Sequence, residues 1–369
     1  MAVPLLDVPA QNGPLANELQ NAFSRVLQSG RYVLGPEVQA FEQEMAKGSG
    51  VDFGIGVSSG TDALLVALLA LEIGPGDEVL CPSFTFFATA GSIARTGATP
   101  VFVDSLPDTF NLNLSDAAAK ITDRTRAIIP VHLFGRTADM EAVQSLADTH
   151  DLKIIEDVAQ AQGAATPDGK PAGGQGDFGA FSFYPTKNLG GLGDGGMLVT
   201  HNPTLAEKAR LYRNHGANPK YHHETIGGNF RLDELQAALL RIKHRHLAGW
   251  IARRQENAQH YLAALADLEG VLLPDAVPGH TWNQFTLRLT EPGQRDALAT
   301  HLRDAAIGHE IYYPEPLHAQ PCFTQFQADD CPVATALCEQ VISLPIYPEM
   351  ESAHLDEVIS AIRAFLGGS

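Results

Sequence analysis

The sequence predicts an α/β protein in which a mostly parallel seven-stranded sheet is followed by a smaller α+β domain. From residue 50 to residue 200, short apolar runs alternate with stretches of helical periodicity, as strands and covering helices do in a parallel sheet. Beyond residue 232 the helical periodicity becomes longer, and strand-like and helical stretches mix without regular alternation. A chain of 369 residues also exceeds the usual size of one hydrophobic core, so we expect two domains.

Seven stretches are predicted as strands of the large sheet. They are residues 53–57, 78–81, 99–103, 127–132, 153–156, 179–184 and 196–200. Helices are predicted between them at residues 62–71, 85–95, 139–149 and 204–212. Because parallel sheets bind ligands beyond the carboxyl ends of their strands, the residues at those ends are candidate functional residues. They are Ser58, Pro82, Asp104, His132, Asp157 and Tyr184.

The chain after the sheet begins with two consecutive helical stretches. The periodicity between residues 232 and 268 predicts one helix that leaves the sheet and another that starts the next domain. We place the boundary near Leu247, which gives a large domain over residues 1–247 and a small domain over residues 248–369, on which the N-terminal segment could also pack. The small domain is predicted to contain a strand and two helices, at residues 284–289, 295–305 and 353–366.

Charge and cysteine content exclude several classes of protein. The formal net charge of −18 argues against a nucleic-acid-binding surface and a polybasic membrane anchor. The N-terminus lacks the pattern of a signal peptide, and no apolar run is long enough to span a bilayer. The cysteines lack a CxxC pair, so we expect neither a metal site nor disulfides; they are Cys81, Cys322, Cys331 and Cys338. We therefore expect a cytoplasmic protein without nucleic-acid or membrane partners.

One lysine stands between a predicted strand and a run of glycines. Residues 181–190 (FSFYPTKNLG) end a buried strand and lead through Lys187 into the glycines that follow. A lysine amine attacks an aldehyde only in its neutral form, so a Schiff-base lysine needs surroundings that lower its pKa. Together with Asp157, Lys187 suggests a Schiff-base enzyme, although most lysines are solvated surface groups.

A strand–turn–helix segment offers a place for a phosphate group. In residues 55–64 (IGVSSGTDAL), small hydroxyl residues precede a helical stretch, and the free N–H groups of a helix start favour phosphate. Ordinary helix capping would explain these residues equally well, and Ser182 on another strand could donate a second contact. Residues 191–196 (GLGDGG) match G-x-G-x-x-G, but a strand follows them, so they do not predict a dinucleotide site.

Another predicted strand ends in two carboxylates. Residues 153–157 (KIIED) read as a buried strand, where an unpaired charge is costly. A protonated pyridine nitrogen would pair with Asp157, whereas Glu156 should point to the opposite face; a carboxylate that caps a loop is the alternative. Residues 82–89 (PSFTFFAT) could supply a ring that stacks on an aromatic cofactor, and we favour Phe86 over Phe84.

Five segments together resemble a known enzyme family. They are residues 30–37 (GRYVLGPE), 59–64 (SGTDAL), 156–160 (EDVAQ), 182–196 (SFYPTKNLGGLGDGG) and 228–238 (GNFRLDELQAA). Over nearly its whole length the chain resembles the DegT/DnrJ/EryC1/StrS family of sugar aminotransferases. The resemblance implies the type I fold of the aspartate aminotransferases, and pyridoxal 5'-phosphate (PLP) as cofactor.

The resemblance also implies a role for individual residues around the cofactor ring. Lys187 would form the Schiff base with PLP and later act as the general base. Asp157 would pair with the pyridine nitrogen and keep the ring protonated. Phe86 would stack on the ring, and Gln160 would lie beside its oxygen substituent.

The phosphate of the cofactor would be held from two subunits. Gly60, Thr61 and Ser182 would bind it from the same chain. In the family, the asparagine of a Gly-x-Asn-x-Arg-Leu-Asp motif reaches the phosphate of the neighbouring subunit, and Asn229 occupies that position here. A homodimer with two shared active sites is therefore implied.

The implied reaction moves an amino group from L-glutamate to a nucleotide-linked ketosugar, as a step of amino-sugar or polysaccharide biosynthesis. Local similarity of residues 221–223 (YHH) to members that act on UDP-linked 3-keto sugars favours such a substrate. The motif positions suggest four residues for the substrate wall, namely Tyr32, His215, His222 and Tyr313. A solvated loop histidine is the commoner role for His222.

Three alternatives stay open. The acceptor could be a dTDP-linked 4-keto sugar or a cyclitol. The reaction could be an aromatising dehydration, because the cofactor residues would be the same; a dehydratase branch with histidine in place of the lysine is disfavoured by Lys187. The protein could also be a non-catalytic regulator that retains the fold, although a sensor has no need of Lys187, Asp157 and Asn229.

Overall fold

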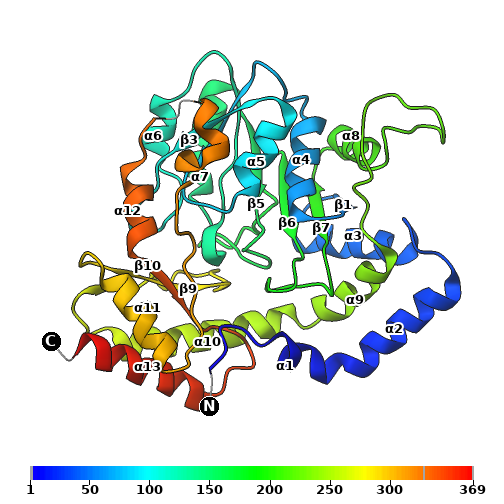
Figure 1. Cartoon of the computed structure of the whole chain (residues 1–369). Helices are drawn as coiled ribbons and strands as arrows, with labels where there is room; N and C mark the ends of the chain where they lie inside the picture. Colours follow the sequence, from blue (N-terminus) through cyan, green and yellow to red (C-terminus); the bar gives the residue numbers. More distant parts are fainter. Residues whose placement is uncertain (1–2, 327–328, 368–369) are drawn as a thin grey trace.

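The computed structural model describes residues 3–326 and 329–367 and contains two separate β-sheets (Figure 1). The larger sheet has seven strands, in the order β1-β7-β6-β5-β4-β2-β3, which confirms the predicted α/β fold. Strand β7 runs antiparallel to β1 and β6, whereas the other neighbouring strands pair in parallel. The strands are β1 (Phe53–Val57), β2 (Glu78–Pro82), β3 (Thr99–Val103), β4 (Thr125–Ile128), β5 (Lys153–Asp157), β6 (Phe178–Ser182) and β7 (Gly196–Thr200).

The fourth strand ends earlier than the sequence predicts. We expected it to reach His132, but β4 ends at Ile128 because Pro130 has no N–H with which to continue the ladder. Pairing with β5 resumes beyond the proline. The carbonyl of Pro130 accepts from the N–H of Asp157 at 2.9 Å, and the N–H of His132 donates to the carbonyl of Asp157 at 3.0 Å. The chain at His132 is thereby held beside the end of β5.

Helices cover the large sheet, and four of them lie within a few residues of their predicted ranges. These are α4 (Gly60–Ala70), α5 (Ala88–Thr96), α7 (Met140–His150) and α8 (Pro203–Arg213). Seven of the eleven residues of α4 are buried, because this helix packs between the sheet and the helices α5 and α8. The remaining helices of this part are α1 (Val8–Asn12), α2 (Ala16–Ser29), α3 (Pro36–Gly48), α6 (Leu114–Ala119) and α9 (Glu234–His244). Short 3-10 turns cover residues 13–15, 133–135, 317–319 and 321–326.

The second sheet lies at the other end of α10 (Leu247–Leu265), the long helix that follows α9 (Figure 1). Its antiparallel strands, in the order β10-β9-β8, are β10 (Val341–Leu344), β9 (Phe285–Leu289) and β8 (Val271–Leu272). Helices α11 (Gln294–Asp304) and α13 (Ser352–Leu366) pack with it around a second hydrophobic core. Val3 joins that core and bonds through its backbone to Ala306 and Gly308. A division into two domains at Leu247 stays a prediction.

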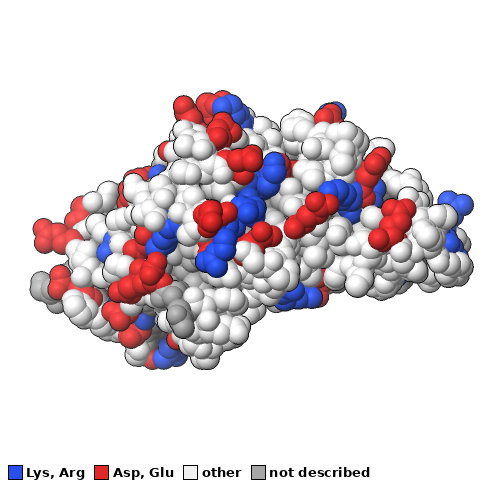
Figure 2. Space-filling view, turned by 90° about the horizontal axis from the view of Figure 1, so that it is seen from above, with Lys and Arg blue, Asp and Glu red and all other residues white. Residues whose placement is uncertain are grey.

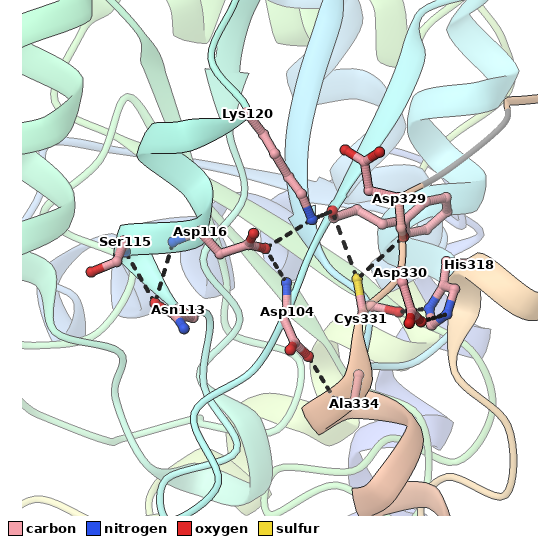
Figure 3. A network of polar contacts seen from close by, with 12 residues as sticks. Asp104, Asn113, Ser115, Asp116, Lys120, His318, Asp329, Asp330, Cys331 and Ala334 are labelled. Atoms are coloured by element: carbon pink, nitrogen blue, oxygen red, sulfur yellow. Dashed lines mark hydrogen bonds and ion pairs between the residues drawn. The ribbon is translucent and has the colours of Figure 1, made fainter.

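The helix α12 (Pro332–Gln340) begins beside the large sheet (Figure 3) and leads into β10 of the small sheet (Figure 1). Both carboxylate oxygens of Asp104, just beyond β3, accept from N–H groups in its first turn, those of Val333 (3.0 Å) and Ala334 (2.8 Å). The N–H of Asp104 in turn donates to Asp116, which also binds Lys120. Asp104 therefore works as a helix cap that ties the two parts together, not as a ligand of the strand-end site.

The surface carries charges of both signs. On the face shown in Figure 2, Lys and Arg side chains lie beside Asp and Glu side chains instead of forming one basic area. None of the helices in the described ranges combines the length and the apolar character that a bilayer crossing requires. The four cysteines are free thiols, and Cys322 is the exposed one among them.

Candidate active site

The carboxyl ends of β5 and β6 bring Asp157 and Lys187 together. Strand β5 ends at Asp157, and β6 pairs with it in parallel, with Ala180 opposite Asp157. The chain leaves β6 at Ser182 and turns back, because the N–H of Lys187 donates to the carbonyl of Tyr184 at 2.9 Å. The two side chains are close enough for the charge of each to act on the pKa of the other.

The surroundings of Lys187 favour its neutral form. Burial lowers the pKa of this amine from 10.5 to about 8, although the carboxylate of Asp157 opposes the shift. The side chain lies deep in the protein while keeping limited access to solvent. The neutral amine, which attack on an aldehyde requires, is therefore far more abundant near neutral pH than in a lysine of ordinary pKa.

Asp157 is held by neutral donors. It is 5% exposed, and its carboxylate accepts from the hydroxyl of Thr89 at 2.9 Å and from the N–H of Ala159 at 3.1 Å. Burial raises the pKa of Asp157 despite these two hydrogen bonds. A cationic group next to Asp157 would stabilise the ionised carboxylate, which burial disfavours. The sequence did not predict a role for Thr89. Its position after β2, at the carboxyl edge of the sheet, is the feature that could have indicated one.

Glu156, the neighbour of Asp157, has a different and complete set of partners. Its carboxylate accepts from the backbone N–H groups of Gly173, Gln175 and Gly176, and it lies 2.9 Å from Nε2 of His132. Burial alone would raise the pKa of Glu156, but these donors hold it below its ordinary value. Glu156 and the strand-end residue His132 thus belong to an internal network on the other face of the sheet.

The start of α4 forms a cradle beside β6. Ser59 caps the helix by accepting from the N–H of Asp62 at 3.0 Å, so Gly60 and Thr61 stand in the first turn. A Cβ added to Gly60 would lie 2.6 Å from Cβ of Ser182, and glycine is therefore required for this close approach. The N–H groups of a first helical turn lack intrahelical partners, so the cradle suits a phosphate.

Phe86 and Tyr313 form the aromatic side of the site. Phe86 is 57% exposed, and its ring centroid lies 6.3 Å from that of Tyr313. Phe84 is 1% exposed and belongs to the core, so it is unsuited to stack on a ligand. Gln160 donates to the hydroxyl of Tyr313 at 2.9 Å and accepts from the N–H of Phe134 at 2.8 Å. Tyr313, which follows α11 in the chain, is thus part of the site.

Asn229 lies apart from this group. It is exposed and lines a cleft of about 590 Å³ together with Ser58, Ser59 and Arg231, on the outer side of the α4 cap. Arg231 donates to the side chain of Asn214 at 2.9 Å, which ties the segment to the end of α8. Within the subunit, the exposed side chain of Asn229 therefore belongs to the wall of this cleft.

Three of the four predicted substrate residues also lie on outward-facing segments. Tyr32 is 45% exposed in the loop before α3, and its hydroxyl donates to the carbonyl of Leu27. His215 and His222 belong to an arm beyond α8, in which Tyr221 is 82% exposed (Figure 1). Within the subunit the structure joins Tyr313, but not these three residues, to the group around Lys187.

The residues present fit PLP on three separate counts. Asp157 is a buried carboxylate with two neutral donors, and a protonated ring nitrogen would supply its missing cation. The Gly60 cradle suits the phosphate, and the amine of Lys187 suits the aldehyde. A buried amine and a buried carboxylate at the strand ends of such a sheet suit a Schiff-base enzyme with a phosphate-bearing cofactor.

The family follows from the amino-acid sequence. Residues 14–363 match the DegT/DnrJ/EryC1/StrS aminotransferase family, and the chain belongs to this family. The chain is 45% identical to a UDP-N-acetyl-3-dehydro-α-D-glucosamine 3-aminotransferase of Acidithiobacillus ferrooxidans, over 100% of this chain and 99% of that protein. It is 47% identical to a dTDP-3-amino-3,4,6-trideoxy-α-D-glucose transaminase of Streptomyces venezuelae, over 98% of this chain and 95% of that protein.

Solved structures agree with this assignment. DesV of S. venezuelae, crystallised in complex with a ketimine intermediate, superposes with a TM-score of 0.95 at 46% identity, covering 99% of this chain and 98% of that one. The chain is therefore an aminotransferase, and more closely a sugar aminotransferase of nucleotide-sugar biosynthesis. The predicted family, fold and enzyme class are confirmed, and aminotransferases of this family are PLP enzymes.

Substituting Asp157→Asn should stabilise the cofactor-free protein, and more at pH 8 than at about pH 4.5. The raised pKa of Asp157 means that the folded state disfavours the ionised carboxylate, so the parent loses stability as pH rises through the folded pKa. The amide does not ionise. Thermal unfolding midpoints (Tm) of parent and variant at both pH values test this expectation.

Glu156→Gln is the matched control. The pKa of Glu156 is lowered in the folded state, so its stabilising contribution is present above the unfolded pKa and is lost as pH falls. This variant should therefore destabilise the protein at pH 8. An Asp157→Asn variant whose Tm advantage does not grow with pH contradicts the expectation.

Proposed function

We propose that this protein binds PLP and transfers an amino group from L-glutamate to a UDP-linked 3-keto sugar. The observation that carries the proposal is the buried pair of Lys187 and Asp157 at the carboxyl edge of the sheet, beside the Gly60 cradle. Neither side chain stabilises the fold in its charged form, because burial disfavours both charges. Their presence is explained by chemistry that uses a neutral amine and a carboxylate.

The cofactor would be held at four points. The amine of Lys187 would hold its aldehyde carbon, Asp157 its ring nitrogen, and the first turn of α4 its phosphate. The ring of Phe86 would cover one face, with stacking worth about 0.5–1.5 kcal/mol beyond burial. When bound, PLP supplies an electron sink that stabilises negative charge at the carbon next to the amino group.

The residues around the cofactor would then have separate roles in the reaction. Nζ of Lys187, once the amino donor has displaced it, would act as the general base: it would take the proton from the substrate carbon and pass it to the carbon atom that the amine had held. Its lowered pKa suits this exchange near neutral pH. Asp157 stays ionised against the ring nitrogen, oriented by Thr89 and by the N–H of Ala159. Gln160 and Tyr313 hold each other in place at the aromatic side of the site.

The choice of acceptor rests on the arm beyond α8. Residues 221–223 are similar to those of members that act on UDP-linked 3-keto sugars, and His222 stands there with an exposed side chain. The identities to the UDP-sugar relative (45%) and to the dTDP-sugar relative (47%) are too similar to distinguish between the two nucleotides. Tyr32, His215, His222 and Tyr313 are proposed to line the acceptor site, the first three from a neighbouring subunit.

A homodimer would complete the site. Exposed apolar side chains surround the segments that carry the distant residues, and they include Tyr32, Val33, Tyr184, Tyr221 and Ile226. Asn229 lines a cleft at the surface instead of meeting the cradle of its own subunit. A second copy placed over this area would bury the apolar groups and bring Asn229 to the phosphate of its partner.

The visible absorption spectrum tests the cofactor and the donor. With PLP added, the parent should show an absorption band that Lys187→Ala lacks, and L-glutamate should abolish the parent's band. If no band forms, the cofactor assignment is wrong. If PLP binds but saturating ketosugar and glutamate yield no 2-oxoglutarate, the non-catalytic regulatory alternative is favoured.

A screen of nucleotide-linked ketosugars tests the acceptor. Among UDP- and dTDP-linked 3-keto and 4-keto sugars, the UDP-linked 3-keto compound should give the highest kcat/KM. Analysis of the products by mass spectrometry distinguishes amination from dehydration, and a cyclitol ketone serves as the comparison outside the nucleotide sugars. Exclusive use of a dTDP-linked 4-keto sugar would overturn the choice of acceptor while leaving the aminotransferase assignment intact.

Mixed dimers test the shared site. Asn229→Asp would set a carboxylate against the phosphate of the partner, so this variant and Lys187→Ala should each be inactive. A mixed dimer of the two, isolated with two affinity tags, has one site with both substitutions and one with neither. It should show about half the activity of the parent dimer.

The control pairs two substitutions that act in their own subunit. A mixed dimer of Lys187→Ala with Asp157→Ala carries one defect in each site and should stay inactive. If the mixed dimer containing Asn229→Asp is equally inactive, the active site does not contain Asn229 of the neighbouring chain.

A further inference from the structure

We propose that Asn188 is a positioning residue that fixes Lys187 by anchoring it to the loop of residues 280–283, at the junction of the two sheets. This inference rests on the proposed function of Lys187 and extends it to the residue that follows in the chain. Asn188 is fully buried, and its Nδ2 donates to the carbonyl of Thr281 at 3.0 Å. The bond joins residues 93 positions apart in the sequence.

The partner of Asn188 is itself held firmly. Thr281 is fully buried, and its N–H donates to the carbonyl of Gly135 at 3.0 Å. Gly135 has a φ of +99°, and a Cβ there would lie 2.6 Å from Oγ1 of Thr281. Only glycine permits this contact without strain. The loop of residues 280–283 thus packs directly against Gly135, which belongs to the large-sheet part of the chain.

The same loop is fastened from the other side by α10. Arg254, which is 1% exposed, donates to the carbonyls of Trp282 (3.0 Å) and Ile346 (2.8 Å). Gln255 donates to the carbonyl of His280 at 3.0 Å. The loop is therefore a rigid support, and the amide of Asn188 is the link between this support and the residue that carries the amine.

A second connection leads from the loop to the opposite side of the site. The N–H of Asn283 donates to the carbonyl of Phe134 at 3.0 Å, and the N–H of Phe134 donates to Gln160. Gln160 in turn holds Tyr313. The loop of residues 280–283 thus holds both sides of the site: it fixes Lys187 through Asn188, and it fixes the Gln160–Tyr313 pair through Phe134.

Fold stability alone does not explain an asparagine at this position. Its Oδ1 has no hydrogen-bond partner in the part of the chain that the structure describes. A buried acceptor without a partner costs about 1–3 kcal/mol, which offsets the gain from the hydrogen bond to Thr281. A requirement at the neighbouring residue accounts for its presence.

The requirement is the burial of the Lys187 amine. Desolvation is the largest contribution to the lowered pKa of this amine. If residue 188 lost its anchor, the turn from Tyr184 to Lys187 could loosen and water could reach the amine. The pKa of Lys187 would then rise toward its ordinary value, and less of the neutral form would be available.

The rate of PLP binding to the cofactor-free protein tests the inference without an activity assay. The second-order rate constant, followed through the growth of the visible band from pH 6 to pH 10, should have a midpoint near 8 in the parent. In Asn188→Leu and Asn188→Ala the midpoint should rise by about 0.5–1 pH unit, because an amine that water reaches regains part of its lost hydration.

Asn257 offers a matched control. It is 3% exposed, and its Nδ2 also donates to one backbone carbonyl, that of Tyr347, at 2.9 Å. Asn257→Leu and Asn257→Ala should leave the midpoint unchanged. The alanine variants bring the smallest change in packing, and circular dichroism confirms that each variant is folded.

The outcomes separate this inference from the proposed function. A parent that forms no band, like Lys187→Ala, overturns both. A normal band in the parent, with the same midpoint in the Asn188 variants, overturns the positioning role alone. An equal shift in the Asn257 variants also overturns it, because the effect would then follow from general destabilisation.

Discussion

The structure depends on one electrostatic constraint, the burial of an amine and a carboxylate side by side. Lys187 and Asp157 are close enough to interact, yet burial lowers the pKa of the amine and raises that of the acid. Desolvation therefore outweighs their mutual attraction, in contrast to an ordinary salt bridge. Around this pair the fold supplies neutral donors only, namely the hydroxyl of Thr89 and the N–H of Ala159. The cation that the carboxylate lacks would come from a cofactor ring.

Two adjacent carboxylates on β5 illustrate how the sheet separates structure from chemistry. Alternation along the strand sends Glu156 to one face, where three backbone N–H groups and His132 surround it. Asp157 points to the other face, and its smaller set of donors leaves it short of positive charge. Two neighbouring acidic residues thus differ in their surroundings: Glu156 holds a loop, whereas Asp157 is available to a ligand. The pKa shifts of the two acids have opposite directions for this reason.

The second sheet contributes to the site through segments that cross back to the large one. Tyr313 meets Gln160, Thr281 meets Asn188, and the first turn of α12 rests on Asp104. Each contact is a hydrogen bond to a buried group, so its geometry is well defined. The outward-facing side differs, since Tyr221 and Asn229 are exposed there. A site built in this way is fixed by buried hydrogen bonds on one side and exposed on the other.

The sequence by itself determined the sheet and the family, and it predicted the roles of Lys187 and Asp157. Those inferences rest on local patterns: apolar runs that end in polar residues, a helix start rich in small hydroxyl residues, and contiguous motifs. It did not predict three hydrogen bonds: that of Thr89 to Asp157, that of Ala334 to Asp104, which makes Asp104 a helix cap, and that of Asn188 to Thr281. Those pairings span 68, 230 and 93 residues. Local periodicity carries no information about such distances, because only the packing of the two sheets decides which buried donor meets which acceptor.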